Sequence, residues 1–177
     1  MRFYAKGIGI FVLVLMLALL LIASQQLYLQ WANSQLSSGL ILIMNLRSNI
    51  QPRDATGPVA TASSVERDYQ ELRKLATDGL VTFAPPGVTL QQNQYQTVVD
   101  AGAAAAAQAV QAFGQHNLVA MEQADAHLLD VADQMIKVRR RLVQDGNQNN
   151  VLIAFGMEGL FLLTIITIIR TMPSRPA

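Results

Sequence analysis

The stretch from Asn117 to Arg170 constrains the fold most, because its first part is amphipathic and its second part is almost wholly apolar. Between residues 117 and 150, apolar side chains recur at steps of three, four or seven, the spacing of one helix face. No proline separates the two parts, and Gly146 is the only strong helix-breaking candidate between them. We therefore expect one helix that begins in water and continues into a bilayer. Its expected buried face is Leu118, Met121, Leu128, Val131, Met135, Val138 and Leu142.

Two apolar runs are long enough to cross a membrane. As helices, residues 151–169 would span about 28 Å and residues 7–23 about 25 Å, against a hydrocarbon core of about 30 Å. The first run could instead be a cleaved signal peptide. We favour an uncleaved anchor, because cleavage after Ala23 would put Leu21 where a small residue is needed. The expected divisions are a leader (1–6), a first membrane helix (7–24), a central domain (25–150), a second membrane helix (151–169) and a tail (170–177).

Composition and charge agree with this division. The chain is 51% hydrophobic and 14% charged, which is too apolar for an ordinary soluble domain. Both ends carry only basic charge, so the positive-inside rule predicts cytoplasmic termini and an extracytoplasmic central domain, as in a bacterial inner-membrane protein. The only basic run, residues 139–141, would lie outside, so no nucleic-acid partner is expected. The absence of cysteine excludes disulfides and thiolate chemistry.

The central domain shows helical periods separated by turns. The first membrane helix should continue to about Ile50, where Pro52 and the Gly57-Pro58 pair end it. Its buried face is expected to contain Leu29, Leu36, Leu40, Ile43 and Ile50, with Arg47 on the same stripe. A second helix should open with a capping box formed by Ser63 and Glu66. The buried face expected for this helix is Val65, Tyr69, Leu72, Ala76 and Leu80.

A turn at residues 84–87 should separate the second helix from a third. The third helix is expected to open with Thr89 and Gln92 as a second capping box and to end at Gly114, with Asn117 capping the fourth helix. Its alanine-rich centre should let a neighbouring helix approach closely. Its expected buried face is Tyr95, Val98, Gly102, Ala106, Ala109 and Phe113.

The predicted fold class is all-α, with two transmembrane helices continuous with an antiparallel four-helix bundle. The alternative is a three-helix hairpin in which one long helix runs from residue 89 to residue 150. We prefer four helices, since Gly114 and Asn117 provide a stop and a start, and since termini on one side of the membrane require an even number of passes.

This layout resembles the periplasmic four-helix-bundle sensor domain of bacterial methyl-accepting chemotaxis receptors and related histidine kinases. The sequence FGQHN at 113–117, followed by AMEQAD at 120–125, is similar to the turn into the last helix of those domains. In the receptors, a HAMP linker and a signalling domain follow the second membrane helix, whereas here only the tail, residues 170–177, follows it. The resemblance therefore implies a sensor module whose output passes laterally to a partner in the membrane.

Glu158 is the most informative candidate site residue, because a carboxylate within a membrane helix is costly unless it is protonated, paired or hydrated. Gly156 and Gly159 flank it, and we interpret them as a place where another helix packs closely. The expected role is contact with a membrane partner or with a second copy of the chain. A proton- or ion-linked role and a merely hydrogen-bonded acid are the alternatives.

Other polar residues are weaker candidates. Arg47 and Arg73 could grip a ligand carboxylate, although each could instead reach the surface or pair with an acid. His116 and His127 match no metal-ligand spacing, so solvated or capping roles are expected. The acidic residues Glu122, Asp125, Asp130 and Asp133 are expected to form a solvated face.

The expected function is therefore non-enzymatic and needs no cofactor or metal. We interpret the chain as an inner-membrane sensor-like signalling and interaction module that could bind a small extracytoplasmic ligand and act through a membrane partner. The alternative is a structural accessory subunit of a larger membrane complex.

Overall fold

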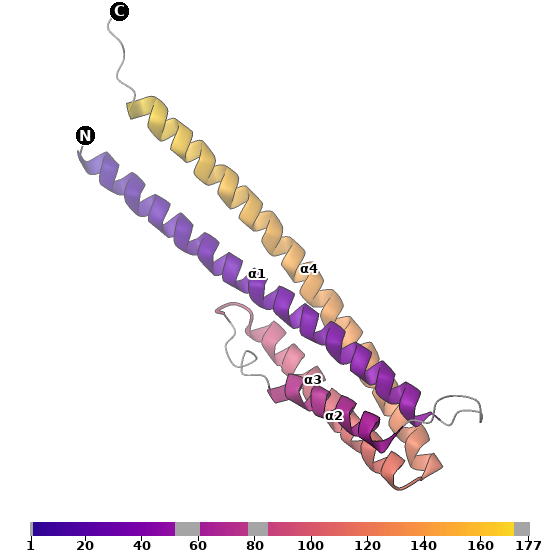
Figure 1. Cartoon of the computed structure of the whole chain (residues 1–177). Coiled ribbons are helices and arrows are strands. Elements are labelled where there is room, and N and C mark those ends of the chain that lie inside the picture. Colours follow the sequence, from indigo (N-terminus) through magenta and orange to yellow (C-terminus); the bar gives the residue numbers. More distant parts are fainter. Residues whose placement is uncertain (1, 52–60, 78–84, 172–177) are drawn as a thin grey trace, which may run out of the picture.

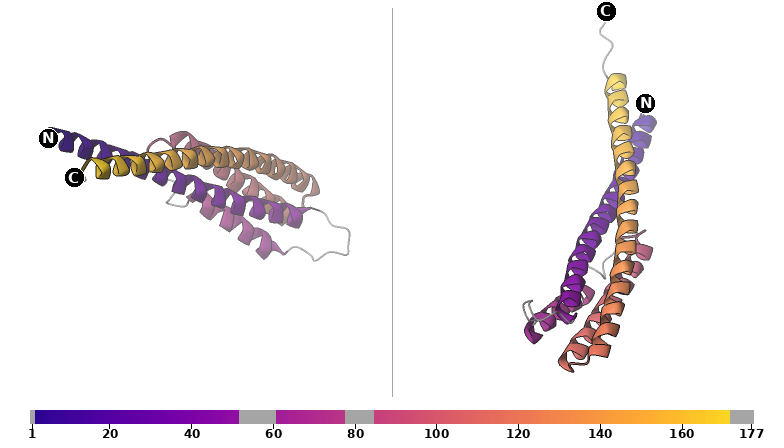
Figure 2. Two further views of the ribbon diagram at one scale, coloured as in Figure 1. Left: turned by 90° about the horizontal axis from the view of Figure 1, so that it is seen from above. Right: turned by 90° about the vertical axis from the view of Figure 1, so that its right-hand side faces the viewer.

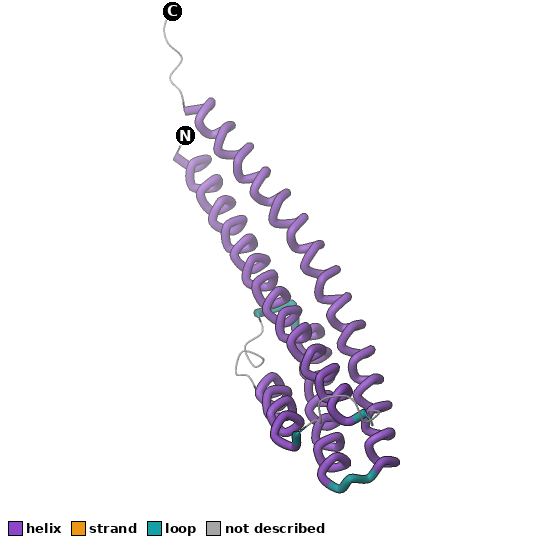
Figure 3. The backbone as a smooth tube through the Cα atoms, turned by 45° about the vertical axis from the view of Figure 1, so that its right-hand side comes forward, coloured by secondary structure: helices purple, strands orange, loops and turns teal. Residues whose placement is uncertain are grey.

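The computed structural model describes residues 2–51, 61–77 and 85–171, and these residues form four α-helices joined by turns (Figure 1, Figure 3). The helices are α1 (Arg2–Ile50), α2 (Ala62–Thr77), α3 (Thr89–Gly114) and α4 (Leu118–Thr171). The prediction of an all-α fold with four helices is confirmed, and the three-helix alternative is wrong, because α3 ends before α4 begins.

Two helices are much longer than the others. The short helices α2 and α3 lie beside the second half of α1 and the first half of α4, and consecutive helices run antiparallel (Figure 1). The first half of α1 and the second half of α4 extend together beyond this bundle, as both views in Figure 2 show. The start of α1 and the end of α4 consequently lie at the same end of the molecule.

Each long helix is continuous where the sequence changes from amphipathic to apolar. Gly146 is buried within α4 and does not break it. A Cβ added there would meet the side chain of Gln26 at 3.4 Å, so the glycine allows α1 to approach α4. This confirms the predicted continuation of both helices.

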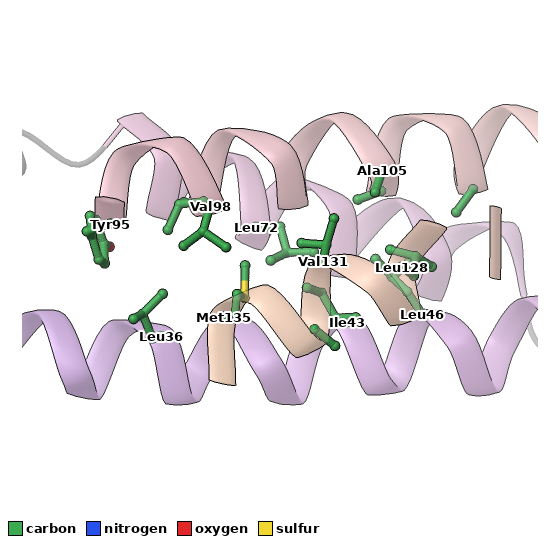
Figure 4. Close-up of a cluster of buried hydrophobic side chains, with 14 of the residues drawn as sticks. Leu36, Ile43, Leu46, Leu72, Tyr95, Val98, Ala105, Leu128, Val131 and Met135 are labelled. Atoms are coloured by element: carbon green, nitrogen blue, oxygen red, sulfur yellow. The ribbon is translucent and has the colours of Figure 1, made fainter. Parts of the chain in front are cut away.

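The core of the bundle is made by the predicted apolar stripes (Figure 4). Met135 of α4 lies near its centre, with its sulfur 3.5 Å from the position of a Cβ on Gly39 of α1. On the other side, its methyl group would lie 2.8 Å from a Cβ on Gly102 of α3. The small residues of α3 thus permit close helix packing, as predicted. Leu118 is an exception to the predicted stripe: it is exposed at the first turn of α4. The predictions for Leu80, Pro52 and the Gly57-Pro58 pair lie outside the described residues.

Two of the predicted helix caps are wrong in detail. Thr61, two residues before Ser63, caps α2: its hydroxyl accepts a hydrogen bond from the amide of Ser64 at 3.3 Å. Val88, whose side chain cannot accept a hydrogen bond, occupies the N-cap position of α3. The start of α3 at Thr89 is nevertheless as predicted, because the turn that precedes it determines where the helix can begin.

The turn between α3 and α4 uses a histidine where a glycine was predicted. His116 has φ +50°, whereas Gly114 is the last helical residue. The amide of Asn117 donates to the carbonyl of Ala112, and the amide of His116 donates to that of Phe113, the two bonds of a Schellman motif. Asn117 then caps α4 as predicted, since its side chain accepts from the amide of Ala120 at 3.1 Å.

Candidate functional site

The apolar halves of α1 and α4 are long and apolar enough to cross a membrane. They are unlike the core helices of a soluble protein, because only 17% of the most apolar window in α1 and none of the one in α4 is buried. The two halves touch each other along one narrow face. The partly covered residues of that face are Val12, Leu15, Leu19 and Ile22 of α1 and Ile153, Gly156, Leu160, Leu163 and Thr167 of α4.

Glu158 does not lie on the face that touches α1. Gly156 does: a Cβ added to it would lie 2.5 Å from the side chain of Leu19. Residues two apart on a helix point in nearly opposite directions, so Glu158 is exposed on the far side of α4. A Cβ on Gly159 would meet nothing within 4 Å. The interpretation that both glycines mark one packing face around Glu158 is therefore corrected: Gly156 packs against α1, and Glu158 points outward.

A polar layer lies where the apolar halves meet the bundle. In α1, Gln25 donates a hydrogen bond of 2.6 Å to the carbonyl of Pro86, in the turn that precedes α3. In α3, Gln91 donates one of 2.8 Å to the carboxylate of Asp145 in α4. The layer therefore connects three helices at the level where two of them leave the bundle. We call it the junction layer: Gln25, Gln26, Tyr28, Pro86, Gln91, Asp145 and Gly146.

The turn at the junction layer needs its glycine. Gly87 has φ +93°, and the amide of Val88 donates to the carbonyl of Pro85 at 3.4 Å, with Pro86 at the second position of the turn. These are the features of a type II turn, which favours proline followed by glycine. A Cβ on Gly87 would also lie 2.6 Å from the amide of Gln25, so a side chain there would displace the hydrogen bond to α1.

Some polar atoms of the junction layer are buried without a hydrogen bond. Among the described residues, none provides a partner for the side-chain oxygens of Gln26, Tyr28 and Gln91. Burial raises the pKa of the Tyr28 phenol, because the charged form would lose its hydration. Buried polar groups without partners are destabilising. The junction layer thus combines two hydrogen bonds between helices with three buried oxygens that have no partner in the described chain.

Arg47 lies at the opposite end of the bundle and is paired within the chain. Its guanidinium donates two hydrogen bonds, of 2.8 and 3.1 Å, to the carboxylate of Asp125 in α4. This pairing, together with amide contacts from Gln51 at 3.4 Å, lowers the pKa of Asp125, and the hydrogen bond to Asp125 raises the pKa of Arg47. The expectation that Asp125 belongs to a solvated face is therefore wrong. Of the three interpretations of Arg47, a ligand contact, a surface position and a pair with an acid, the geometry shows the pair with an acid.

The remaining predicted candidates lie apart from one another. Arg73 is exposed on α2. His127 is hydrogen-bonded to Gln108 of α3 at 2.8 Å. The ring of His116 lies in the turn described above, 6.5 Å from that of Phe113 and tilted by 52° to it. Within the described parts of the chain, no group of three or more histidine, aspartate or glutamate side chains could hold a metal ion.

A groove between α3 and α4 was not predicted. It has a volume of about 340 Å³ and lies alongside the core residues Val98 and Val138. Lys137 and Arg141 lie on its α4 wall, and amide and hydroxyl side chains of α3 line the other wall. Lys137 is paired with Asp133 at 2.6 Å, so Arg141 is the groove cation without an ion pair in the described chain, and it is placed to hold a small anion. The other lining residues are Asn93, Gln94, Thr97 and Gln134.

The three consecutive arginines of α4 point in three directions, because each residue advances a helix by about 100°. Arg139 donates to the side chain of Asn33 in α1 at 3.1 Å. Arg141 lines the groove beside α3. Arg140 lies between these directions, on the side of α4 away from the bundle, and makes no ion pair with any residue of the described chain.

Asp68 of α2 is a buried carboxylate that the sequence did not single out. Its side chain accepts a hydrogen bond of 3.5 Å from Asn49 and lies 3.7 Å from the guanidinium of Arg67. Burial raises the pKa of Asp68, and the nearby arginine opposes this only in part. The sequence could have indicated this burial. Asp68 lies three residues after Val65 and four before Leu72, and residues three or four apart share a helix face.

Comparisons with known proteins place the chain in no family: no protein-family model, no curated protein and no solved structure matches it.

Proposed function

We propose that this protein is a sensor-like signalling and interaction module of the bacterial inner membrane, with its bundle on the extracytoplasmic side and both termini in the cytoplasm. The observation that carries the proposal is the continuity of α1 and α4 from the packed core into exposed apolar halves. A change in the bundle that moves one of these helices must also move its apolar half. The basic chain ends support the orientation.

The proposed input is a small anionic ligand in the groove between α3 and α4. Arg141, together with Lys137 released from its ion pair with Asp133, would bind it from α4, while Asn93 and Gln94 would hold it from α3. Binding would favour one relative position of the two helices over another. The junction layer would permit the shift, because its buried oxygens without a hydrogen-bond partner in the described chain lose no hydrogen bond when the helices move.

The proposed output is contact with a membrane partner through the outward face of α4. Glu158 supports this, because its side chain points away from α1 and has no partner in the described chain. The same feature supports the alternative, a structural accessory subunit, in which Glu158 docks permanently to a larger complex and the bundle binds no ligand.

A cross-linking experiment separates the two. The full-length variant Leu19→Cys/Gly156→Cys, in lipid nanodiscs, places two cysteines at the contact between the apolar halves, and the chain has no others. We expect a small carboxylate or phosphate from a screened panel to change the rate of disulfide formation several-fold. Arg141→Ala should remove this response, and Arg140→Ala, outside the groove, should keep it.

The same protein should be extracted gently from its native membrane and identified together with whatever accompanies it. Variable recovery of a signalling protein, with a ligand response, supports the sensor module. Fixed stoichiometry with one large complex, without any ligand response, would contradict it and would support the accessory subunit.

A further inference from the structure

We infer that one exposed face of α4 docks a membrane-continuous helix of a different protein, and that this helix carries an acidic residue opposite Arg140. The face, which we call the outer stripe, consists of Leu129, Ile136, Arg140, Val143, Val151 and Glu158. The inference rests on the membrane placement proposed above, and it adds the surface and the kind of partner.

The outer stripe is straight and crosses the boundary between the bundle and the apolar half. Its aliphatic members and Glu158 follow one another at steps of seven, seven, eight and seven residues, which keeps them on one side of an α-helix. Each of the four aliphatic side chains is between 40% and 53% exposed. Three of them, Leu129, Ile136 and Val143, lie in the part that packs in the bundle. Heptad spacing of exposed aliphatic residues is typical of one half of a coiled-coil seam.

A shallow, open patch lies on this stripe at the junction with the apolar half, and every residue that lines it belongs to α4. The patch is covered from one side only, so a second helix has room to lie against it. The lining residues are Arg140, Val143, Gln144, Asn147, Gln148 and Val151.

The charges on the stripe specify the partner. Arg140 and Glu158 lie 18 residues apart, which is five helical turns and about 27 Å on the same side of α4. Neither has an ion-pair partner in the described chain. A complementary helix would present an acid beside Arg140, aliphatic side chains beside Val143 and Val151, and a basic or hydrogen-bond-donating group at the depth of Glu158.

A second copy of this chain does not meet these requirements. Two copies in one membrane share the same orientation, so α4 against α4 would bring Arg140 to Arg140 and Glu158 to Glu158. The α1 helix contains no acidic residue to face Arg140, and its apolar run, residues 7–23, offers no polar side chain to Glu158. The helices α2 and α3 do not extend beside the apolar halves, so neither could lie along the whole outer stripe and face Glu158 as well as Arg140 (Figure 1). A single helix that provides both complementary groups must therefore come from a different protein.

Site-specific photo-cross-linking in the native membrane tests this. A photoreactive residue replaces Ile136 or Val143 on the stripe, and Gln134, which is exposed but lines the groove beside α3, serves as the control position. We expect the two stripe positions to give one adduct with another integral membrane protein, several times stronger than the control. The cross-linked peptide should belong to a helix that continues into a membrane span and carries Asp or Glu within about two turns.

Charge reversal gives an independent readout. Arg140→Glu should lower the adduct yield several-fold, whereas Arg73→Glu, which reverses an exposed charge on α2, should leave it unchanged. An adduct with a second copy of the chain, an adduct lacking a nearby acid, or no adduct would overturn the inference. Alkaline extraction of the same membranes distinguishes failure of the docking face from failure of the proposed membrane placement. If the protein stays in the membrane without giving an adduct, only the docking face is contradicted. If the protein is released, the membrane placement is contradicted.

Discussion

Arg47 and Asp125 lie 78 positions apart in the sequence and are joined by two hydrogen bonds, of 2.8 and 3.1 Å, between α1 and α4. Both side chains are mostly covered, with 19% and 22% of their surfaces exposed. The pair links the two long helices, α1 and α4, at the end of the bundle farthest from their apolar halves. A charge-assisted, bidentate pair of this kind is stronger than an exposed one.

Loss of the Arg47 guanidinium should therefore destabilise the fold. We expect Arg47→Met, which keeps the length of the side chain, to lower the free energy of unfolding by about 1–3 kcal/mol. Chemical denaturation followed by circular dichroism measures this. The matched control is Lys74→Met, which removes an exposed ion pair with Glu71; it should move the midpoint much less. Equal effects from both variants would contradict the structural role of the pair.

The lowered pKa of Asp125 makes stability depend on pH. Because the folded-state pKa lies below the ordinary value, the contribution is present above about pH 4 and is lost as the pH falls through the folded-state pKa. We expect Asp125→Asn to weaken the fold at neutral pH and to flatten this acid loss. Melting temperatures measured from about pH 2 to pH 7 show both effects.

The contribution of Asp68 to stability should change with pH in the opposite direction to that of Asp125. Its folded-state pKa is raised by burial, so its contribution is fully present below about pH 4 and is lost as the pH rises through the raised pKa. Asp68→Asn keeps a hydrogen-bonding group beside Asn49 and removes the charge, so it should raise the melting temperature at neutral pH and not at about pH 3. A lower melting temperature at neutral pH would show that the ionised carboxylate stabilises the fold.

The turn between α3 and α4 provides a prediction about backbone conformation. A non-glycine residue at positive φ is strained, so His116→Gly should stabilise the protein by about 1 kcal/mol. Gly114 has helical geometry and open space around it, so Gly114→Ala should also stabilise it, by about 0.5–1 kcal/mol. If Gly114 were the residue with positive φ, the alanine variant would instead be less stable. Thermal unfolding of the two variants decides this.

Helix number, helix continuity and the core could be predicted because they depend on periodic apolar residues. Leu36, Ile43, Leu72, Leu128 and Met135 are all buried on the stripes that the spacing indicates. The caps were less predictable, since Thr61, Ser63 and Ser64 all can cap a helix and only the three-dimensional turn selects one.

The polar part of the site was less accessible to sequence analysis. The pairing of Arg47 with Asp125 depends on how α1 and α4 are rotated about their axes, which spacing within one helix does not determine. The outward direction of Glu158, however, could have been predicted from the sequence. Gly156 lies two residues before it, and residues two apart do not share a helix face, so the glycine could not mark packing on the side of Glu158.

The junction layer supports a pair of predictions with opposite signs. Gln26→Met keeps the shape of the side chain and removes a buried amide oxygen that has no partner in the described chain, so it should raise the free energy of unfolding by about 1 kcal/mol. Gln25→Met removes the hydrogen bond to the carbonyl of Pro86 and should lower it by about as much. Unfolding of the full-length protein in detergent measures both. A loss of stability in both variants would show that the amide of Gln26 is well paired.

Transmission from the bundle to the membrane requires that α4 be one rigid helix from the bundle into its apolar half. Spin labels on Gln134→Cys and Leu152→Cys, the only cysteines of the double variant, lie 18 residues and five turns apart on either side of Gly146. Electron–electron double resonance in nanodiscs should give a single narrow distance distribution near 27 Å, the length of about 18 residues of α-helix. A broad or much shorter distribution would show a break at Gly146 and would contradict transmission along α4.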